Sequence, residues 1–191
     1  TTLKASFDVL NRASFFKRHV VSGELTYSWR PTETSQFKLS PLTLTYEYMQ
    51  SRTKKFMEME DSMPYLKTSM ADQFMPKAEF SYIYTSPSAF RNPIKWRSTI
   101  SESANIVSLG YLCAGDKWNE KGKTVFKNPY AQFFKIETKL TKLWQIADKS
   151  SIAAHASAGV IYSYGNSRVA PYSEQFYVGG ANSIRAFNVR S

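Results

Sequence analysis

Residues 150–165 read SSIAAHASAGVIYSYG, and this stretch decides the fold class. Its even-numbered positions from Ile152 to Tyr164 are apolar or aromatic, whereas most odd-numbered positions, His155 among them, are small or polar. A side-chain period of two is the signature of a β-strand whose two faces meet different surroundings. The run is longer than the roughly 5–6 residues typical of strands. The stretch therefore predicts a long strand with one apolar and one polar face.

The same alternation recurs in further segments of the chain. In residues 97–113 the apolar phase changes near Ile106 and Val107, which predicts a β-bulge inside one long strand. With the first stretch, these segments predict seven strands, the others lying at residues 3–9, 25–29, 42–48, 78–85, 97–113 and 134–141.

Aromatic side chains make up 15% of the chain and gather near the ends of the predicted strands. Rings at strand ends suit a membrane interface, where an aromatic side chain rests between hydrocarbon and water. The alternative is that aromatic residues simply favour strands. The paired rings are Tyr27 and Trp29, Tyr46 and Tyr48, Tyr82 and Tyr84, and Tyr162 and Tyr164.

The connections between strands alternate in length. Links at 30–41, 85–95 and 147–151 are short, whereas those at 50–77 and 115–130 are long. In an up-and-down sheet, successive links lie at opposite ends, so this sorting predicts short turns at one end and long loops at the other, as in outer-membrane barrels. The apolar runs are too short for a membrane-spanning helix, which requires about 18 residues. The predicted fold is an all-β, transmembrane, antiparallel up-and-down β-barrel.

The long link at 53–74 spaces its Met and Phe residues three or four apart, which predicts a short amphipathic helix broken at Pro64. Its methionines form either a small core for the loop or an adaptable binding surface.

Cofactor and metal sites are not expected. A lone cysteine, Cys113, excludes a disulfide within these residues and any multi-cysteine metal site, and His19 and His155 are far apart in sequence. An enzyme is not expected either, because no G-x-S-x-G elbow occurs and His155 lies in a regular strand. Glu102 and Glu137 are interpreted as counter-charges to Lys and Arg inside a barrel.

The net charge of +10 with many aromatics also allows a soluble nucleic-acid-binding domain. The basic residues are scattered, however, and no RNA-binding or zinc-finger pattern exists, so nucleic acid is not an expected partner. Loop lysines either bridge phosphates of lipopolysaccharide or are simply solvated; they are Lys117, Lys121, Lys123 and Lys127.

The last twenty residues before Ser191 carry a motif, PYSEQFYVGGANSIRAFNVR. Gly179 and Gly180 permit a tight turn or close packing against another backbone. Arg185 is flanked by Ile184 and Phe187, which favours an anchored, hydrogen-bonding guanidinium over a solvated charge.

This segment resembles the hallmark of the BamA/TamA superfamily of outer-membrane assembly proteins, the bacterial surface-antigen family, in which the pattern is roughly S-E-x-F-x-x-G-G-x-x-S-[VI]-R-G-[FY]. Ala186 departs from it, since the family usually has glycine there. The matching residues are Ser173, Glu174, Phe176, Gly179, Gly180, Ser183, Ile184, Arg185 and Phe187.

The resemblance implies a sixteen-stranded barrel preceded by periplasmic POTRA domains. Residues 1–191 are then part of a single barrel domain of about seven strands, and residues 166–191 form an extracellular loop that folds into the lumen. In the family the motif arginine, here Arg185, pairs with acidic residues on later strands. We therefore expect a fragment of a longer protein.

The function implied is insertion or translocation of outer-membrane proteins in the outer membrane of Gram-negative bacteria. The alternative within the same superfamily is a passive pore or a two-partner secretion-type exporter. The expected partners are client outer-membrane proteins, outer-membrane lipid and lipopolysaccharide, and periplasmic or lipoprotein accessory subunits.

Overall fold

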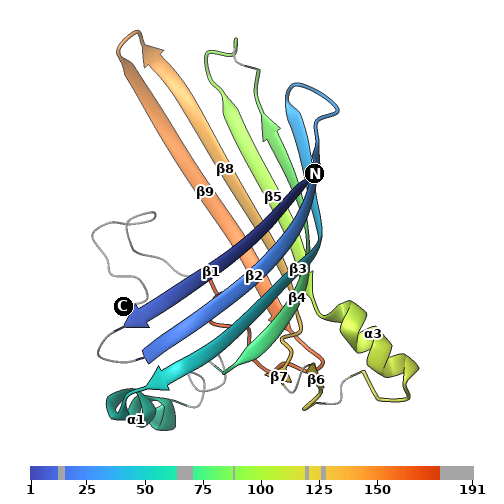
Figure 1. Ribbon diagram of the computed structural model, residues 1–191. Coiled ribbons are helices and arrows are strands. Elements are labelled where there is room, and N and C mark those ends of the chain that lie inside the picture. Colours follow the sequence, from blue (N-terminus) through green and yellow to red (C-terminus); the bar gives the residue numbers. More distant parts are fainter. Residues whose placement is uncertain (13–15, 64–70, 88, 119–120, 126–127, 177–191) are drawn as a thin grey trace.

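The computed structural model describes residues 1–12, 16–63, 71–87, 89–118, 121–125 and 128–176. Seven antiparallel strands form one curved sheet, in which each strand pairs with the next in the order β1-β2-β3-β4-β5-β8-β9 (Figure 1). This up-and-down order confirms the predicted fold class. Within the described residues the sheet does not close, and β1 and β9 are its edges. The strands are β1 (Thr2–Arg12), β2 (Phe16–Trp29), β3 (Ser35–Arg52), β4 (Gln73–Thr85), β5 (Ile94–Ser103), β8 (Phe133–Ala147) and β9 (Ser150–Ser163).

The two ends of the sheet differ as predicted. The links β2–β3, β4–β5 and β8–β9 are short and lie together at the top of Figure 1. The opposite end carries the two long links, which contain helices α1 (Lys54–Ser62) and α3 (Asn105–Cys113) and a hairpin of β6 (Thr124–Val125) and β7 (Asn128–Pro129). Among the described helices, none combines the length and hydrophobicity needed to cross a membrane.

The sheet has an apolar convex face and a polar concave face, because the strand register aligns side chains of one kind. Phe80 pairs with Ile100, Ile100 with Ile136, and Ile136 with Val160, and all four side chains are exposed on the outside. One position along, the register aligns Glu79, Ser101 and Lys135 on the inside. A row of uncovered apolar side chains opposite a polar interior is the pattern of a barrel wall in lipid.

Aromatic rings contact one another near both ends of the convex face. At the short-turn end, ring centroids lie 5.4 Å apart for Trp29 and Phe37, 5.1 Å for Phe37 and Tyr82, and 5.5 Å for Tyr82 and Trp96. This is where the interpretation as a membrane-interface belt places them. Pairs at the opposite end are Tyr46 with Tyr48 and Tyr162 with Tyr164.

The prediction of one bulged strand at 97–113 was wrong, because β5 ends at Ser103 and a helix follows. Ala104 has a φ of 62°, a left-handed conformation that turns the chain out of the sheet. The backbone amide of Asn105 then donates to the Glu102 carboxylate at 3.2 Å, which begins α3. The change of apolar phase seen in the sequence near Ile106 and Val107 therefore marks the passage from a strand, with a period of two residues, to a helix.

The predicted helix in the 53–74 link exists but is shorter. It begins where the Thr53 hydroxyl accepts from the Phe56 amide at 3.4 Å, and it ends at Ser62. Phe56 packs against Phe16 with ring centroids 5.0 Å apart, and both are buried. Phe56 therefore packs against the strands and Tyr172, whereas Met57 and Met63 of the link are exposed, so the interpretation of the link as having its own methionine core was wrong. Pro64 lies outside the described residues.

Candidate functional site

The candidate site is an ionic anchor that holds the chain after β9 against the concave face of the sheet. Gly165, at a φ of 56°, turns the chain away from β9. Residues 171–176 then lie against the inside of the sheet, where Glu174 is bound by Lys77 of β4 and Lys135 of β8. The Glu174 carboxylate oxygens lie 2.9 Å from the Lys77 Nζ and 3.0 Å from the Lys135 Nζ. The Lys135 Nζ also donates to the Glu174 carbonyl at 2.9 Å.

Two lysines from non-adjacent strands converge on one carboxylate because the strand between them carries small side chains. β5 separates β4 from β8, and its inward-facing residues beside the lysines are Ser101 and Ser103. Ser103 pairs with Lys77, and Ser101 pairs with Lys135. Serine leaves the space above β5 open, so long lysine side chains from both sides can reach over it.

The anchor is largely withdrawn from water. The side chains of Glu174, Lys77 and Lys135 are between 15% and 19% exposed. Burial alone would raise the pKa of the Glu174 carboxyl, but the charges and hydrogen bonds of the two lysines outweigh it and hold that pKa below its usual value. Glu174 is therefore ionised at neutral pH. Glu79, 3.8 Å from the Lys77 Nζ, supplies a second negative charge.

An aromatic residue two positions after Glu174 adds a further contact to the anchor. The Lys135 Nζ lies 4.9 Å from the centroid of the Phe176 ring, a cation–π geometry. The ring occupies the space where a Cβ on Gly159 of β9 would lie. A glycine inside this strand thus serves close packing by the returning chain.

Apart from an apolar cluster of Met75, Phe133 and Ile161 near the long loops, the concave face of β8 and β9 is mostly polar, as the strand phases predict. Glu137 forms an ion pair with Lys139, and the His155 Nδ1 lies 3.0 Å from the Thr141 hydroxyl. The interpretation of Glu102 as a counter-charge in the lumen was wrong. Glu102 pairs with Ala78 and Phe134, whose side chains have the outward phase, and it accepts from the backbone of α3.

The predicted motif residues Gly179, Gly180, Ser183, Ile184, Arg185 and Phe187 lie outside the described residues. Glu174 and Phe176 of the same motif lie inside them and form the anchor. Sequence reasoning missed Lys77 and Lys135 as partners of Glu174. The available signal was a lysine in the polar phase of a predicted strand, which Lys135 shows clearly.

One predicted loop lysine is not a solvated charge. Lys123 is 7% exposed, donates from Nζ to the Lys117 carbonyl at 2.6 Å and lies over the Tyr111 ring. Across the described ranges, no group of three His, Cys, Asp or Glu side chains is arranged to hold a metal ion.

Comparison with known proteins identifies the family. The model of the Omp85 superfamily domain matches residues 17–191, almost the whole chain. No curated protein and no solved structure matches it. The chain therefore belongs to the Omp85 superfamily, a superfamily of outer-membrane protein insertion and translocation.

Proposed function

We propose that this chain is part of an outer-membrane barrel of the BamA/TamA type, which assists the insertion of other outer-membrane proteins. Its work is physical. A barrel whose seam opens exposes unpaired strand edges, and these edges template the strands of a client protein by β-augmentation. Membership in the superfamily and the lipid-type convex face of the sheet support this function.

The anchor at Glu174 is the observation that carries the proposal. A barrel that opens at a seam needs the rest of its wall to keep its curvature. Glu174 ties β4 to β8 across β5 from the inside, which stiffens the wall at this point. We propose that residues 166–191 form a lumen loop, in which Gly179, Gly180, Ser183, Ile184, Arg185 and Phe187 extend the anchor, with Arg185 as its second ionic contact.

The alternative is a passive pore or a two-partner secretion-type exporter. The polar concave face, with the Glu137–Lys139 pair and His155, suits a water-filled lumen equally well. This alternative requires continuous passage through the lumen, which an anchored loop obstructs.

We place the protein in the bacterial outer membrane, with client outer-membrane proteins as partners. Lipid contacts the convex face, and Lys121, an exposed residue of the long β5–β8 link, is a candidate contact for lipopolysaccharide phosphate. The proposed partners also include periplasmic or lipoprotein accessory subunits. None of these roles involves a catalytic residue or a cofactor.

Reconstitution of the full-length protein tests the function. An unfolded outer-membrane protein is added to proteoliposomes, and its folding is followed by heat-modifiable migration. We expect faster folding than with empty liposomes or with liposomes that contain an unrelated barrel. Unchanged folding together with steady ion conductance would instead favour the pore or exporter.

A further inference from the structure

The burial pattern of helix α3 is the reverse of the usual one, because three of its apolar side chains are exposed and a polar side chain is buried. Ile106, Leu109 and Leu112 are 72%, 53% and 46% exposed, and at 100° per residue they share one side of the helix with Cys113. Ser108, roughly 100° around the helix from the middle of that side, is 0% exposed. A surface helix of a water-soluble domain shows the reverse arrangement.

The buried side of α3 is fixed by hydrogen bonds. The Ser108 hydroxyl lies 3.0 Å from the Tyr130 hydroxyl and donates to the Gln132 Oε1 at 2.9 Å. The Tyr164 hydroxyl donates to the Asn105 Oδ1 at 2.7 Å at the start of the helix. With these polar groups satisfied, α3 has a defined orientation, and the exposure of its apolar side follows from that orientation.

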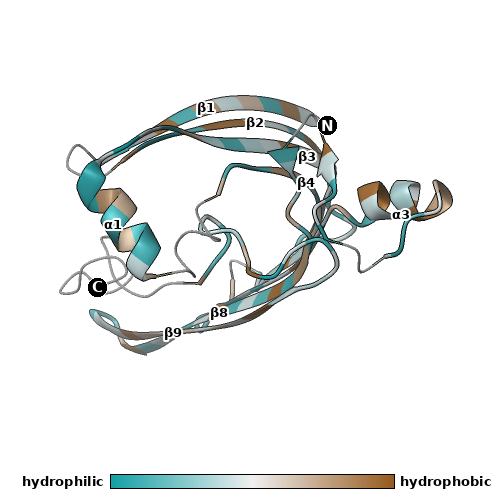
Figure 2. Cartoon of the chain, turned by 90° about the horizontal axis from the view of Figure 1, so that it is seen from below, coloured by the Kyte–Doolittle hydropathy of each residue, from teal (hydrophilic) through white to brown (hydrophobic). Residues whose placement is uncertain are grey.

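These partners place α3 on the outside of the sheet. Gln132 has the opposite phase to Phe133, which packs with Met75 and Ile161 on the concave face. Figure 2 shows α3 beyond the convex side of the sheet and α1 on the concave side. Both helices lie at the end with the long loops (Figure 1).

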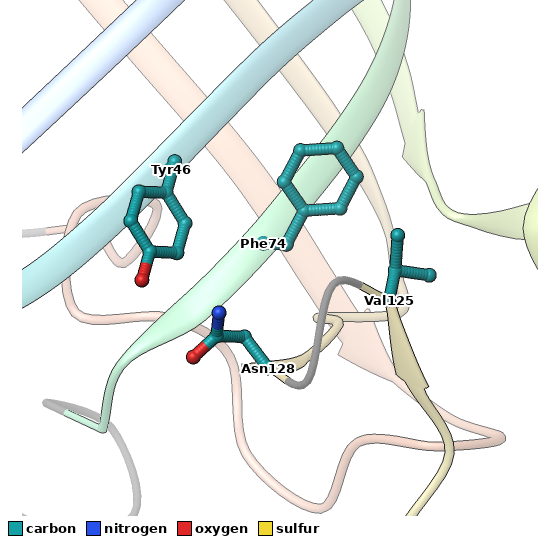
Figure 3. A pocket seen from close by; sticks show the side chains of 4 residues that line it. All are labelled: Tyr46, Phe74, Val125 and Asn128. Atoms are coloured by element: carbon teal, nitrogen blue, oxygen red, sulfur yellow. The ribbon is translucent and has the colours of Figure 1, made fainter.

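The β5–β8 link, which carries α3, also forms a hollow on the convex face. A hollow of about 360 Å³ lies between Tyr46 of β3, Phe74 of β4, and Val125 and Asn128 of the β6–β7 hairpin (Figure 3). Tyr46 and Phe74 pair with each other in the register of the outward-facing side chains. The link that carries α3 therefore lies beside outward-facing side chains of the barrel wall at β3 and β4.

We propose that α3 is an interfacial helix that lays Ile106, Leu109 and Leu112 among the acyl chains of the lipid around the barrel. Helices of this kind lie in the plane of the interface with their apolar side in the boundary between headgroups and chains. Continuity with the lipid-facing wall identifies lipid as the occupant. This inference rests on the membrane location in the proposed function.

Fluorescence quenching in liposomes tests the position of α3. The full-length protein, with any cysteine outside residues 1–191 replaced by serine, is labelled at Cys113 with an environment-sensitive fluorophore. Two matched probes are made on a Cys113→Ser background, namely Ala156→Cys on the convex face of β9 and Met57→Cys on α1. Quenching is compared between lipids brominated on the acyl chains and aqueous iodide.

We expect the Cys113 and Ala156→Cys probes to be quenched several-fold more by brominated lipid than the Met57→Cys probe, and less by iodide. If only Ala156→Cys responds to brominated lipid, the barrel is in the membrane and the inference about α3 is wrong. If neither responds, the membrane location itself is wrong. Protection of Cys113 from both quenchers would show a protein partner over α3 and would overturn the proposal.

Discussion

Neutralising Glu174 is the change that most directly perturbs the anchor. Glu174→Gln keeps the shape of the side chain and removes the charge that Lys77 and Lys135 share. The amide retains one acceptor oxygen, so one lysine keeps a hydrogen bond to a now neutral acceptor and the other faces an NH₂ group. We expect residues 171–176 to leave the concave face more often, while the strands stay paired.

The magnitude follows from the two ionic hydrogen bonds. A hydrogen bond to a charged group contributes about 1.5–3 kcal/mol and a neutral one about 0.5–1.5 kcal/mol. Lys77 retains Glu79 at 3.8 Å, and the residual exposure of the anchor weakens the interaction, so the low end applies. At about 1.5 kcal/mol for each of the two bonds, less about 0.5–1.5 kcal/mol for the bond that is kept, the expected cost is about 1.5–2.5 kcal/mol, or roughly a 10- to 60-fold larger population of the released segment.

Native-state hydrogen exchange of the full-length protein measures this population. The Glu174 amide donates to the Pro171 carbonyl at 3.0 Å, so its exchange reports release of the segment. The matched control is Glu137→Gln, which removes a carboxylate of the same face that pairs with Lys139. Exchange in residues 171–176 should accelerate in Glu174→Gln and remain unchanged in the control.

A double-mutant cycle separates the anchor from a general charge effect. Lys135→Met and Glu174→Gln are compared singly and together, and the anchor predicts a coupling free energy above about 0.5 kcal/mol. Strictly additive effects, or equal acceleration by Glu137→Gln, would refute the reasoning.

Three further predictions are tested by hydrogen exchange of residues 171–176 or by the stability of the barrel. Because its folded pKa is lowered, Glu174 contributes stability above the unfolded value of 4.5 and loses it as the pH falls through the lower folded pKa. The exchange difference between wild type and Glu174→Gln should therefore persist from pH 8 to pH 5 and shrink below about pH 4.5; a constant difference down to pH 3 would contradict the assignment. Gly159→Val places a side chain where the Phe176 ring lies, at a cost of about 1–3 kcal/mol, and should release residues 171–176 as measured by exchange. Ala156→Val, on the convex face of the same strand, should leave exchange unaltered, and an equal effect of both would count against the packing argument. Arg185→Ala should lower the temperature of the heat-modifiable transition and slow client folding more than Arg185→Lys; wild-type behaviour in both assays would argue against an anchoring arginine.

The fold was predictable wherever both faces of a strand carry uniform side chains. Residues 150–165 alternate with only Ile161 out of phase, and β9 spans Ser150–Ser163. The first half of β2 was missed because Val20 and Val21 place apolar residues on both faces. The helix α3 was missed because a short apolar run fits either a buried strand or a helix, and the turn at Ala104 has no glycine to mark it.

The anchor could be predicted only in part, because it joins residues far apart in the chain. The sequence identifies Glu174 as a motif residue and Lys135 as a residue of the polar face. It contains no signal that Lys77, nearly a hundred positions earlier, meets the same carboxylate. That contact depends on the strand order, which places β5 with its serines between β4 and β8.

Site-specific cross-linking in the native membrane tests the central claim that the chain after β9 is anchored inside the barrel. On a Cys113→Ser background, Phe176→Cys is combined with Gly159→Cys or, as the control, with Ala158→Cys, so that Glu174, Lys77 and Lys135 stay intact, and each full-length pair is treated with a short thiol cross-linker. Position 159 faces the lumen and position 158 faces outward. The account predicts a cross-link at position 159 and none at position 158. An equal yield at both positions, or a yield at position 158 alone, would contradict it.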